Sequence, residues 1–363
     1  MHRWTMWLFI GFAACQGGGD TAGDPADTPT GGTTPTTTGS TGTGTTDPTV
    51  DPTDSPTDPT GADTAPTDTA SVTTDTGATT ASGDTGIPTV AFDCSTIHPL
   101  PASYDTLRWV APAEDFLFTP DGLMMAVHGG TLKSTEWGGA QTVLVPNLGD
   151  VRGTRMLPDG RVAMASIATG SILVVDPATG ARETFGGLTN PNGIAIGADG
   201  RIYAATTGRI MAVDPADGSL EVIAEMNNRS FDGLSFSPDY QRLYFNEEVG
   251  RVHWVDFDAN YVPGPVQDGP NIPIGAFSIL DGMAVDACGN LYTTEMGSTV
   301  WRITPQGDVD VVLVVQGVAI LPALNFGTGV GGWDAETLYV MDFLGKMYAV
   351  DVGVPGKWEP HWP

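Results

Sequence analysis

Apolar and polar residues alternate in short runs along most of the chain, and from position 114 these runs recur about every forty residues. Each unit has an apolar strand, a tight turn with Asp or Gly, and a second strand. A Gly turn, a third strand that commonly ends in Asp and a fourth strand follow. The second strands are LMMAV, VAMAS, IYAAT, LYFNE, LYTTE and LYVMD. These six units predict an all-β fold, a six-bladed β-propeller.

The last unit shows three strands before the chain reaches Pro355-Gly356. We predict that residues 107–110, ahead of the first unit, supply its missing fourth strand by pairing with residues 346–350. This pairing closes the ring and covers the sheet edges. The predicted propeller domain spans residues 89–363.

The first quarter of the chain differs in composition. Residues 16–86 are nearly all Thr, Asp, Pro, Gly, Ala and Ser, without an aromatic residue, Lys or Arg. Such a segment buries too little apolar surface to offset the entropy of ordering it. We therefore predict a disordered linker over residues 15–88.

A basic N-terminus and an apolar run at residues 4–14 precede this linker. The run is too short to span a bilayer, and its end before Cys15 resembles a bacterial lipobox. We predict a signal peptide over residues 1–14 and lipid modification of Cys15, which anchors the protein to the membrane. An ordinary signal peptide with an incidental cysteine is the alternative. Gln16 after the cysteine favours an outer-membrane lipoprotein, on its periplasmic or its outer side.

The net charge bears on which partners the protein can bind, and the remaining cysteines bear on whether a disulfide forms. The formal net charge is −28, which argues against nucleic acid and is compatible with cation binding. Cys94 and Cys288 remain besides Cys15. In an oxidising envelope an even number favours a disulfide, and both lie in polar, turn-like contexts. We predict a Cys94–Cys288 bond, with two separate buried thiols as the alternative.

Five polar residues share one position, eight residues before the turn residue of their unit. They are Glu114, Arg152, Asn192, Asp232 and Asp281, with Asn325 as the nearest equivalent in the sixth unit. Asp-Gly and Asn-Gly pairs are common turn formers, so the shared register carries the functional prediction. In a closed ring the three carboxylates repel one another unless a proton or a cation neutralises them. Oxygen ligands favour Ca²⁺, with Mg²⁺ and Zn²⁺ as alternatives.

Three segments resemble the regucalcin (senescence-marker protein), gluconolactonase and strictosidine-synthase-like family of six-bladed propellers. They are Asn192-Gly193, FDGLSFSPD at 231–239, and LDGMAVD at 280–286 with GNLY at 289–292. The resemblance implies that Glu114 and Asp281 are metal ligands and that Asp281 is also the catalytic base. It implies that Asn192 is a substrate-side amide. Asp232 stands where the family usually has Asn, and it adds a third carboxylate to the metal ligands.

Two functions are compatible with these residues. The first is a metal-dependent lactonase or esterase-like hydrolase, in which the ion polarises a carbonyl and activates water while Arg152 orients an anionic substrate group. The second is a non-catalytic surface propeller that binds a protein or glycan partner, with the ion stiffening the hub. An open pocket above the ion favours the enzyme and a plugged channel favours the binding module. In both cases we predict a monomer.

Overall fold

The computed structural model describes residues 87–362 apart from residues 96, 97, 277 and 318. The predicted signal peptide, Cys15 and most of the predicted linker lie outside the described residues. Within the described residues the secondary structure consists of strands. This part of the chain contains no helix that is long and apolar enough to cross a membrane.

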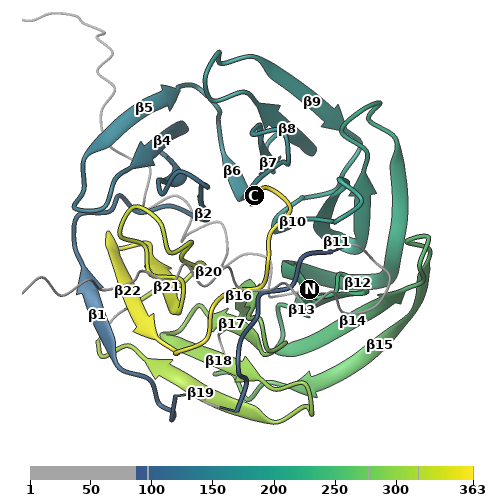
Figure 1. Ribbon diagram of the computed structural model, residues 1–363. Helices are drawn as coiled ribbons and strands as arrows, with labels where there is room; N and C mark the ends of the chain where they lie inside the picture. Colours follow the sequence, from purple (N-terminus) through teal and green to yellow (C-terminus); the bar gives the residue numbers. More distant parts are fainter. Residues whose placement is uncertain (1–86, 96–97, 277, 318, 363) are drawn as a thin grey trace, which may run out of the picture. The chain divides into compact units, whose positions relative to one another are not determined.

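The strands form five antiparallel sheets around a central axis (Figure 1). The first two sheets contain β2 (Phe116–Phe118), β3 (Met124–His128), β4 (Thr131–Thr135) and β5 (Gln141–Val145), then β6 (Val151–Met156), β7 (Val162–Ser166), β8 (Ser171–Val175) and β9 (Arg182–Gly186). A six-stranded sheet follows, with β10 (Ile194–Ile196), β11 (Ile202–Val213), β12 (Leu220–Phe236), β13 (Arg242–Glu247), β14 (Arg251–Phe257) and β15 (Pro263–Asn271). The fourth sheet contains β16 (Leu280–Val285), β17 (Leu291–Glu295), β18 (Thr299–Ile303) and β19 (Val309–Val314). The fifth contains β20 (Ala323–Phe326), β21 (Thr337–Asp342), β22 (Lys346–Asp351) and β1 (Tyr104–Leu107).

The β-propeller fold is confirmed, but the number of sheets is five rather than the predicted six. The difference arises from β12, a continuous strand that belongs to two neighbouring repeat units. Its first part pairs with β11, through Val213↔Leu220, and its last part pairs with β13, through Phe236↔Leu243. The third and fourth repeat units therefore share one sheet. β11 is continuous in the same way and contains the second and third strands predicted for its unit.

The chain closes on itself through β1, which pairs with β22 between Tyr104↔Val350 and Leu107↔Met347. The predicted partner of the last unit is thus correct, but the strand lies three residues earlier than predicted. Trp109 explains the shift, because its ring packs 5.5 Å from the rings of Trp137 and Trp333. Residues 108–113 therefore leave the outer edge and lead inward to β2.

The turns between the first and second strands follow from glycine. Gly122, Gly160, Gly200 and Gly289 have φ between 80° and 87°, a conformation that a residue with a Cβ rarely adopts. Each glycine N–H donates to the carbonyl three residues earlier, as Gly160 does to Leu157 at 2.9 Å. Tyr240 replaces glycine in the corresponding turn and adopts φ 57°. These turns return the chain at the end of the inner strands that lies away from residues 114, 152, 192, 232 and 281.

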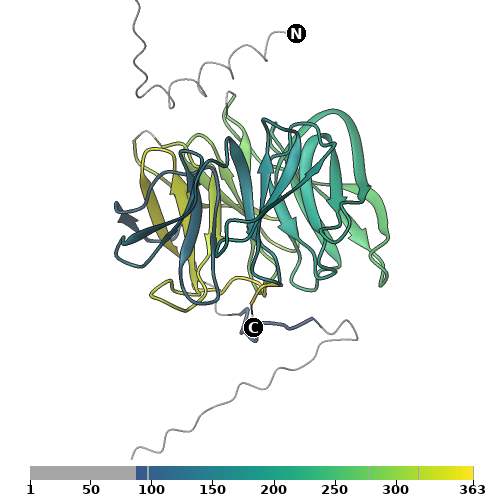
Figure 2. The ribbon, with the colours of Figure 1, turned by 90° about the horizontal axis from the view of Figure 1, so that it is seen from above.

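The C-terminal tail, residues 353–362, lies against this turn end (Figure 2). Lys357 N–H donates to the carbonyl of Val285, and His361 Nε2 donates to the carbonyl of Phe118 at 3.1 Å. The Lys357 ammonium is buried and donates to Tyr240 and Glu359. Both backbone acceptors lie at the far ends of β16 and β2, so the tail covers one end of the central channel.

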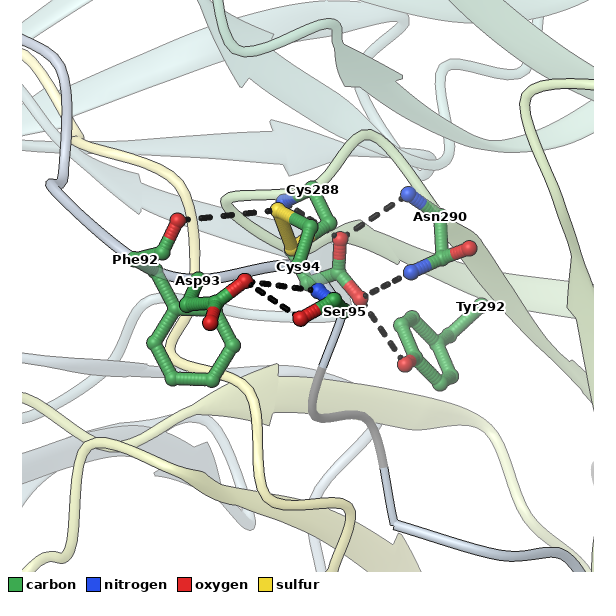
Figure 3. The surroundings of a disulfide bond; sticks show 8 residues. Phe92, Asp93, Cys94, Ser95, Cys288, Asn290 and Tyr292 are labelled. Carbon is green, nitrogen blue, oxygen red and sulfur yellow. Dashed lines mark hydrogen bonds between the residues drawn. A yellow bond between two sulfur atoms is a disulfide. The ribbon is translucent and has the colours of Figure 1, made fainter.

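A disulfide attaches the first described segment to the same end. Cys94 and Cys288 are bonded with a Cα–Cα distance of 5.7 Å, so the predicted pairing is confirmed (Figure 3). Cys288 lies in the turn that follows β16, where the Asp286 carboxylate accepts the backbone N–H groups of Cys288 and Asn290. This carboxylate also accepts the Tyr292 hydroxyl at 2.9 Å. The disulfide therefore joins residues 87–95 to a firmly held turn.

Candidate functional site

The predicted polar register forms a ring at the other end of the inner strands, and we call it the hub ring. Four residues of the hub ring are each followed by a glycine. They are Arg152, Asn192, Asp232 and Asp281. Each of these glycines lies against the next inner strand. A Cβ added to Gly153, Gly193 or Gly233 would lie 2.1–2.5 Å from the carbonyl oxygen of Asn192, Asp232 or Asp281, respectively. Glycine is therefore required for this close approach, which fixes the residue before it at the mouth of the channel.

Backbone hydrogen bonds continue the ring and identify its sixth member. Gly153 N–H donates to Asn192 O, Gly193 N–H to Asp232 O, and Gly282 N–H to Pro322 O. The sixth position is therefore Pro322, and the prediction of Asn325 is wrong. The Asn325 amide instead accepts the N–H of Phe326 and contacts the carbonyl of Phe116 at 3.4 Å. The hub ring thus comprises Glu114, Arg152, Asn192, Asp232, Asp281 and Pro322.

Asn246, which the sequence analysis missed, joins two members of this ring. Its side chain lies fully buried on β13, between β12 and β16. Its Oδ1 accepts the N–H of Gly233 at 2.9 Å, and its Nδ2 donates to Asp281 O at 2.5 Å and to Thr293 Oγ1 at 3.1 Å. The amide therefore replaces the direct backbone bond between these two inner strands. A polar residue inside the apolar second strand LYFNE was the signal that could have identified it.

Glu114 and Arg152 form an ion pair between the first two inner strands. Arg152 Nη1 donates to Glu114 Oε1, and the two side chains are 25% and 16% exposed. Burial raises the pKa of Glu114, although the Arg152 guanidinium acts in the opposite direction. Arg152 Nε is buried and has no hydrogen-bond partner among the described residues. Glu114 therefore depends on this guanidinium for its neutralisation in the structure.

Asp232 and Asp281 are more deeply buried, with 2% and 7% of their surface exposed. Burial, followed by the carboxylates of Glu248 and Glu114, raises the pKa of Asp232 well above its ordinary value. Burial, followed by Asp232 and Glu114, does the same to the pKa of Asp281. Asp232 Oδ1 is buried and has no hydrogen-bond partner within the described part of the chain. A buried carboxylate oxygen without a donor is costly unless a proton or a cation reaches it.

The predicted ligands lie at the same mouth, but they do not converge as a preformed metal centre. Among the described residues, no three His, Cys, Asp or Glu side chains are grouped so that they could hold a metal ion. The physical reason is that Glu114 is paired with Arg152. The donor chemistry nevertheless fits a hard cation, because Asp232 presents a buried, unpaired oxygen beside Asp281. Glu248, half-buried next to Asp232, is a further carboxylate that the sequence analysis did not identify.

A cavity of about 20 Å³ lies on the central axis, lined by Glu114, Asn192, Asp281, Arg155 and Pro322 among others. This volume holds about one water molecule. Asn192 thus borders the cavity from the hub ring, as expected for a residue that faces the channel. The tail covers the opposite end, so the mouth above the hub ring is the end of the channel that the tail leaves uncovered.

These features define a β-propeller with an acidic hub, and comparisons with known proteins show which family part of it resembles. Residues 205–342 match the family described as SMP-30/Gluconolactonase/LRE-like region. The predicted resemblance to regucalcin and gluconolactonase is therefore confirmed. No curated protein sequence matches the chain significantly.

Three solved structures illustrate the similarity of fold. Regucalcin from Agrobacterium tumefaciens, described as a calcium-binding protein, is 20% identical; the match covers 71% of this chain and 95% of that one, with a TM-score of 0.58. A gluconolactonase from Xanthomonas campestris is 17% identical, with coverages of 69% and 90% and a TM-score of 0.55. Virginiamycin B lyase from Staphylococcus aureus is 16% identical, with coverages of 69% and 99% and a TM-score of 0.52. At these identities the structures establish the fold.

Proposed function

We propose that this chain is a divalent-cation-binding propeller that hydrolyses a small lactone or ester at the mouth of its channel. The observation that carries the proposal is the buried Asp232 Oδ1, which has no hydrogen-bond partner among the described residues. Burial and then neighbouring carboxylates raise the pKa of Asp232 and of Asp281, which a cation bound beside them would counter. Ca²⁺ suits these oxygen donors best.

Each hub residue has a defined role in this mechanism. Glu114, Asp232 and Asp281 would hold the ion, which supplies Lewis-acid polarisation of the substrate carbonyl. Asp281 would also accept a proton from the attacking water, since its carboxylate lines the cavity beside the mouth. The Asn192 amide would donate to a substrate oxygen, and the Arg152 guanidinium would orient an anionic substrate group.

Two further parts of the proposal concern the number of blades and the attachment of the protein to a membrane. We infer that the six-stranded sheet functions as two blades, so that six blades surround the hub. We further propose that lipid-modified Cys15 anchors the protein to the outer membrane, as a monomer. The disulfide holds residues 87–95 at the tail-covered end, so the mouth would face away from the point where the linker leaves the propeller.

A second candidate is a non-catalytic surface propeller that binds a protein or glycan. The observation that favours it is the narrow channel, which has room for about one water molecule. In this case the cation would only neutralise the hub carboxylates and stiffen the ring. Both candidate functions include a bound cation, but only the first includes hydrolysis of a substrate.

Metal analysis of the purified protein, followed by calcium titration calorimetry after chelation, tests the cation. We expect binding that Asp281→Asn and Glu114→Gln weaken strongly. Bound Ca²⁺ at a hundredfold excess over its Kd should raise the free energy of unfolding by about 2.7 kcal/mol. A chelated protein that neither binds Ca²⁺, Mg²⁺ or Zn²⁺ nor changes its Tm in their presence would refute the proposal.

A panel of lactones and esters, with and without chelator, tests catalysis. We expect turnover that Asn192→Ala abolishes while cation affinity stays within about threefold, because an amide contributes less to cation binding than a carboxylate. If the protein binds the cation but turns over no substrate of the panel, the non-catalytic surface propeller is the remaining candidate function.

A further inference from the structure

Arg152 is the one cationic side chain in the hub ring, whose other charged members are acids. Its guanidinium contacts Glu114 and acts electrostatically on Asp232 and Asp281. When all three carboxylates of the hub ring are ionised, they and the one guanidinium leave two negative charges without compensation, the charge that one divalent cation supplies. Arg152 therefore provides part of the positive charge that the hub ring requires.

Arg152 is held less firmly than Arg155, the next arginine along β6. Arg155 Nη1 donates to both Asp115 and the carbonyl of Thr154, and Asp115 is itself fixed by the N–H groups of Thr154 and Phe116. Arg152 instead donates to Glu114, while its Nε lies 3.9 Å from Asp150 Oδ1 and is buried without a hydrogen-bond partner in the described part of the chain. A buried N–H without an acceptor costs free energy. Arg152 therefore has one direct hydrogen-bond partner, Glu114, to exchange when a cation reaches the hub ring.

We propose that the Arg152 guanidinium takes the place of a bound cation in the metal-free protein and that a divalent ion displaces it from Glu114. In the metal-free protein the guanidinium neutralises Glu114. When an ion binds beside Asp232 and Asp281, Glu114 turns to it and the guanidinium moves to the mouth. There it binds an anionic group of the ligand, such as a carboxylate. This inference rests on the proposed cation binding and adds its coupling to ligand recognition.

The displacement has a simple electrostatic cause. A divalent ion attracts Glu114 more strongly than a guanidinium does, and the two cations repel each other inside the ring. The side chains of Arg152 and Glu114 are 25% and 16% exposed, so the pair lies at the solvent side of the hub ring and the guanidinium has a short path outward. Ligands would then bind in a fixed order, the ion before the anion. The preferred substrate is a lactone or ester that carries a negative charge.

Calcium titration calorimetry on the full chain provides the first test. Arg152→Met keeps the length of the side chain but removes its charge, and we expect it to bind Ca²⁺ at least about tenfold more tightly than the wild type. Arg209→Met is the matched control, because Arg209 is not part of the hub ring, pairs with the exposed Glu225, and its loss changes the net charge equally. An Arg152→Met protein with an unchanged or weaker Ca²⁺ affinity would overturn the proposal.

Modification of arginine by phenylglyoxal, mapped by mass spectrometry, tests the movement in the wild-type protein and needs no variant. We expect Ca²⁺ to increase the rate at Arg152 at least about threefold, since a guanidinium released from its ion pair is more accessible, and to leave Arg209 unchanged. Equal or slower modification of Arg152 in protein saturated with Ca²⁺ would contradict the displacement alone. Failure of the wild type to bind Ca²⁺ would instead refute the proposed function.

Discussion

Asn246 should be required both for stability and for the shape of the cation site. Its buried amide satisfies three groups, namely Gly233 N–H, Asp281 O and Thr293 Oγ1. Two of these belong to the backbone of neighbouring inner strands that carry Asp232 and Asp281. Replacing Asn246 by Ala therefore leaves buried polar groups unpaired and removes the link between the two carboxylate-bearing segments.

The magnitude follows from these contacts. A buried group that loses its partner costs about 1–3 kcal/mol, so three groups at the lower limit cost about 3 kcal/mol. For a domain of this size that loss lowers the Tm by about 6–12 °C. We also expect Asn246→Ala to weaken Ca²⁺ binding about tenfold, because the spacing of two ligands is no longer fixed.

Thermal unfolding with and without chelator, together with calorimetry, measures both effects. Asn246→Leu fills the volume without hydrogen bonds and should lower the Tm as far as Asn246→Ala does. Asn290→Ala is the matched control, since this buried amide donates to Asp286 at the opposite end of the same sheet as Asp281. It should lower the Tm and leave the Ca²⁺ affinity unchanged. If Asn246→Leu unfolds like the wild type, or if both alanine variants bind Ca²⁺ equally well, Asn246 does not position the site.

Four further predictions concern the ends of the propeller. Thiol labelling of the denatured, non-reduced protein should detect neither Cys94 nor Cys288, and Cys94→Ser should lower the free energy of unfolding by about 2–4 kcal/mol; two reactive thiols would disprove the bond. In a Cys288→Ser background, which removes the disulfide from both proteins, deletion of residues up to 110 should lower the Tm much more than deletion up to 86, because it removes β1, its pairing with β22 and the partly buried Leu107; equal melting would show that β1 does not close the ring. Burial lowers the pKa of His361, so the unfolded chain takes up the proton first and stability should fall as the pH drops below about 6.5; Tm measurements at pH 7.5 and 5.5 should show a smaller loss for His361→Asn, and equal losses would contradict this role. Cys15→Ser should leave the membrane fraction as a folded protein, and continued membrane retention would refute the lipid anchor.

The strands and the register of the hub ring were predictable because both depend on local pattern. Alternating apolar residues and turn glycines such as Gly160 specify hairpins, and the repeat places equivalent residues at equivalent depths. The sequence therefore predicted that Glu114, Asp232 and Asp281 share one end of the channel. The Cys94–Cys288 bond was also predictable, on the expectation that Cys15 is lipid-modified and that the protein folds in an oxidising envelope, because each remaining cysteine then has one possible partner.

The remaining features depend on contacts between different units. Pro322 takes the sixth position because its carbonyl meets Gly282, which no count from a turn residue reveals. The third and fourth units share one sheet because β12 runs without a break from the last strand of one unit to the first strand of the next. The pairing of Arg152 with Glu114 depends on how the two side chains lie across neighbouring inner strands. The sequence analysis predicted only that the Arg152 guanidinium orients an anionic substrate group.

The hub ring shows why a charge-deficient site persists in a stable fold. The close approach of Gly193 and Gly233 to their neighbouring strands fixes the backbone of Asp232 and Asp281, and both residues are buried there. Burial then opposes their charge, and the pKa of each rises. The backbone of the ring thus holds three carboxylates close together, and the Arg152 guanidinium neutralises only part of their negative charge. In the proposed function a divalent ion at the mouth would neutralise the rest, and cation binding would then follow from how the ring is built.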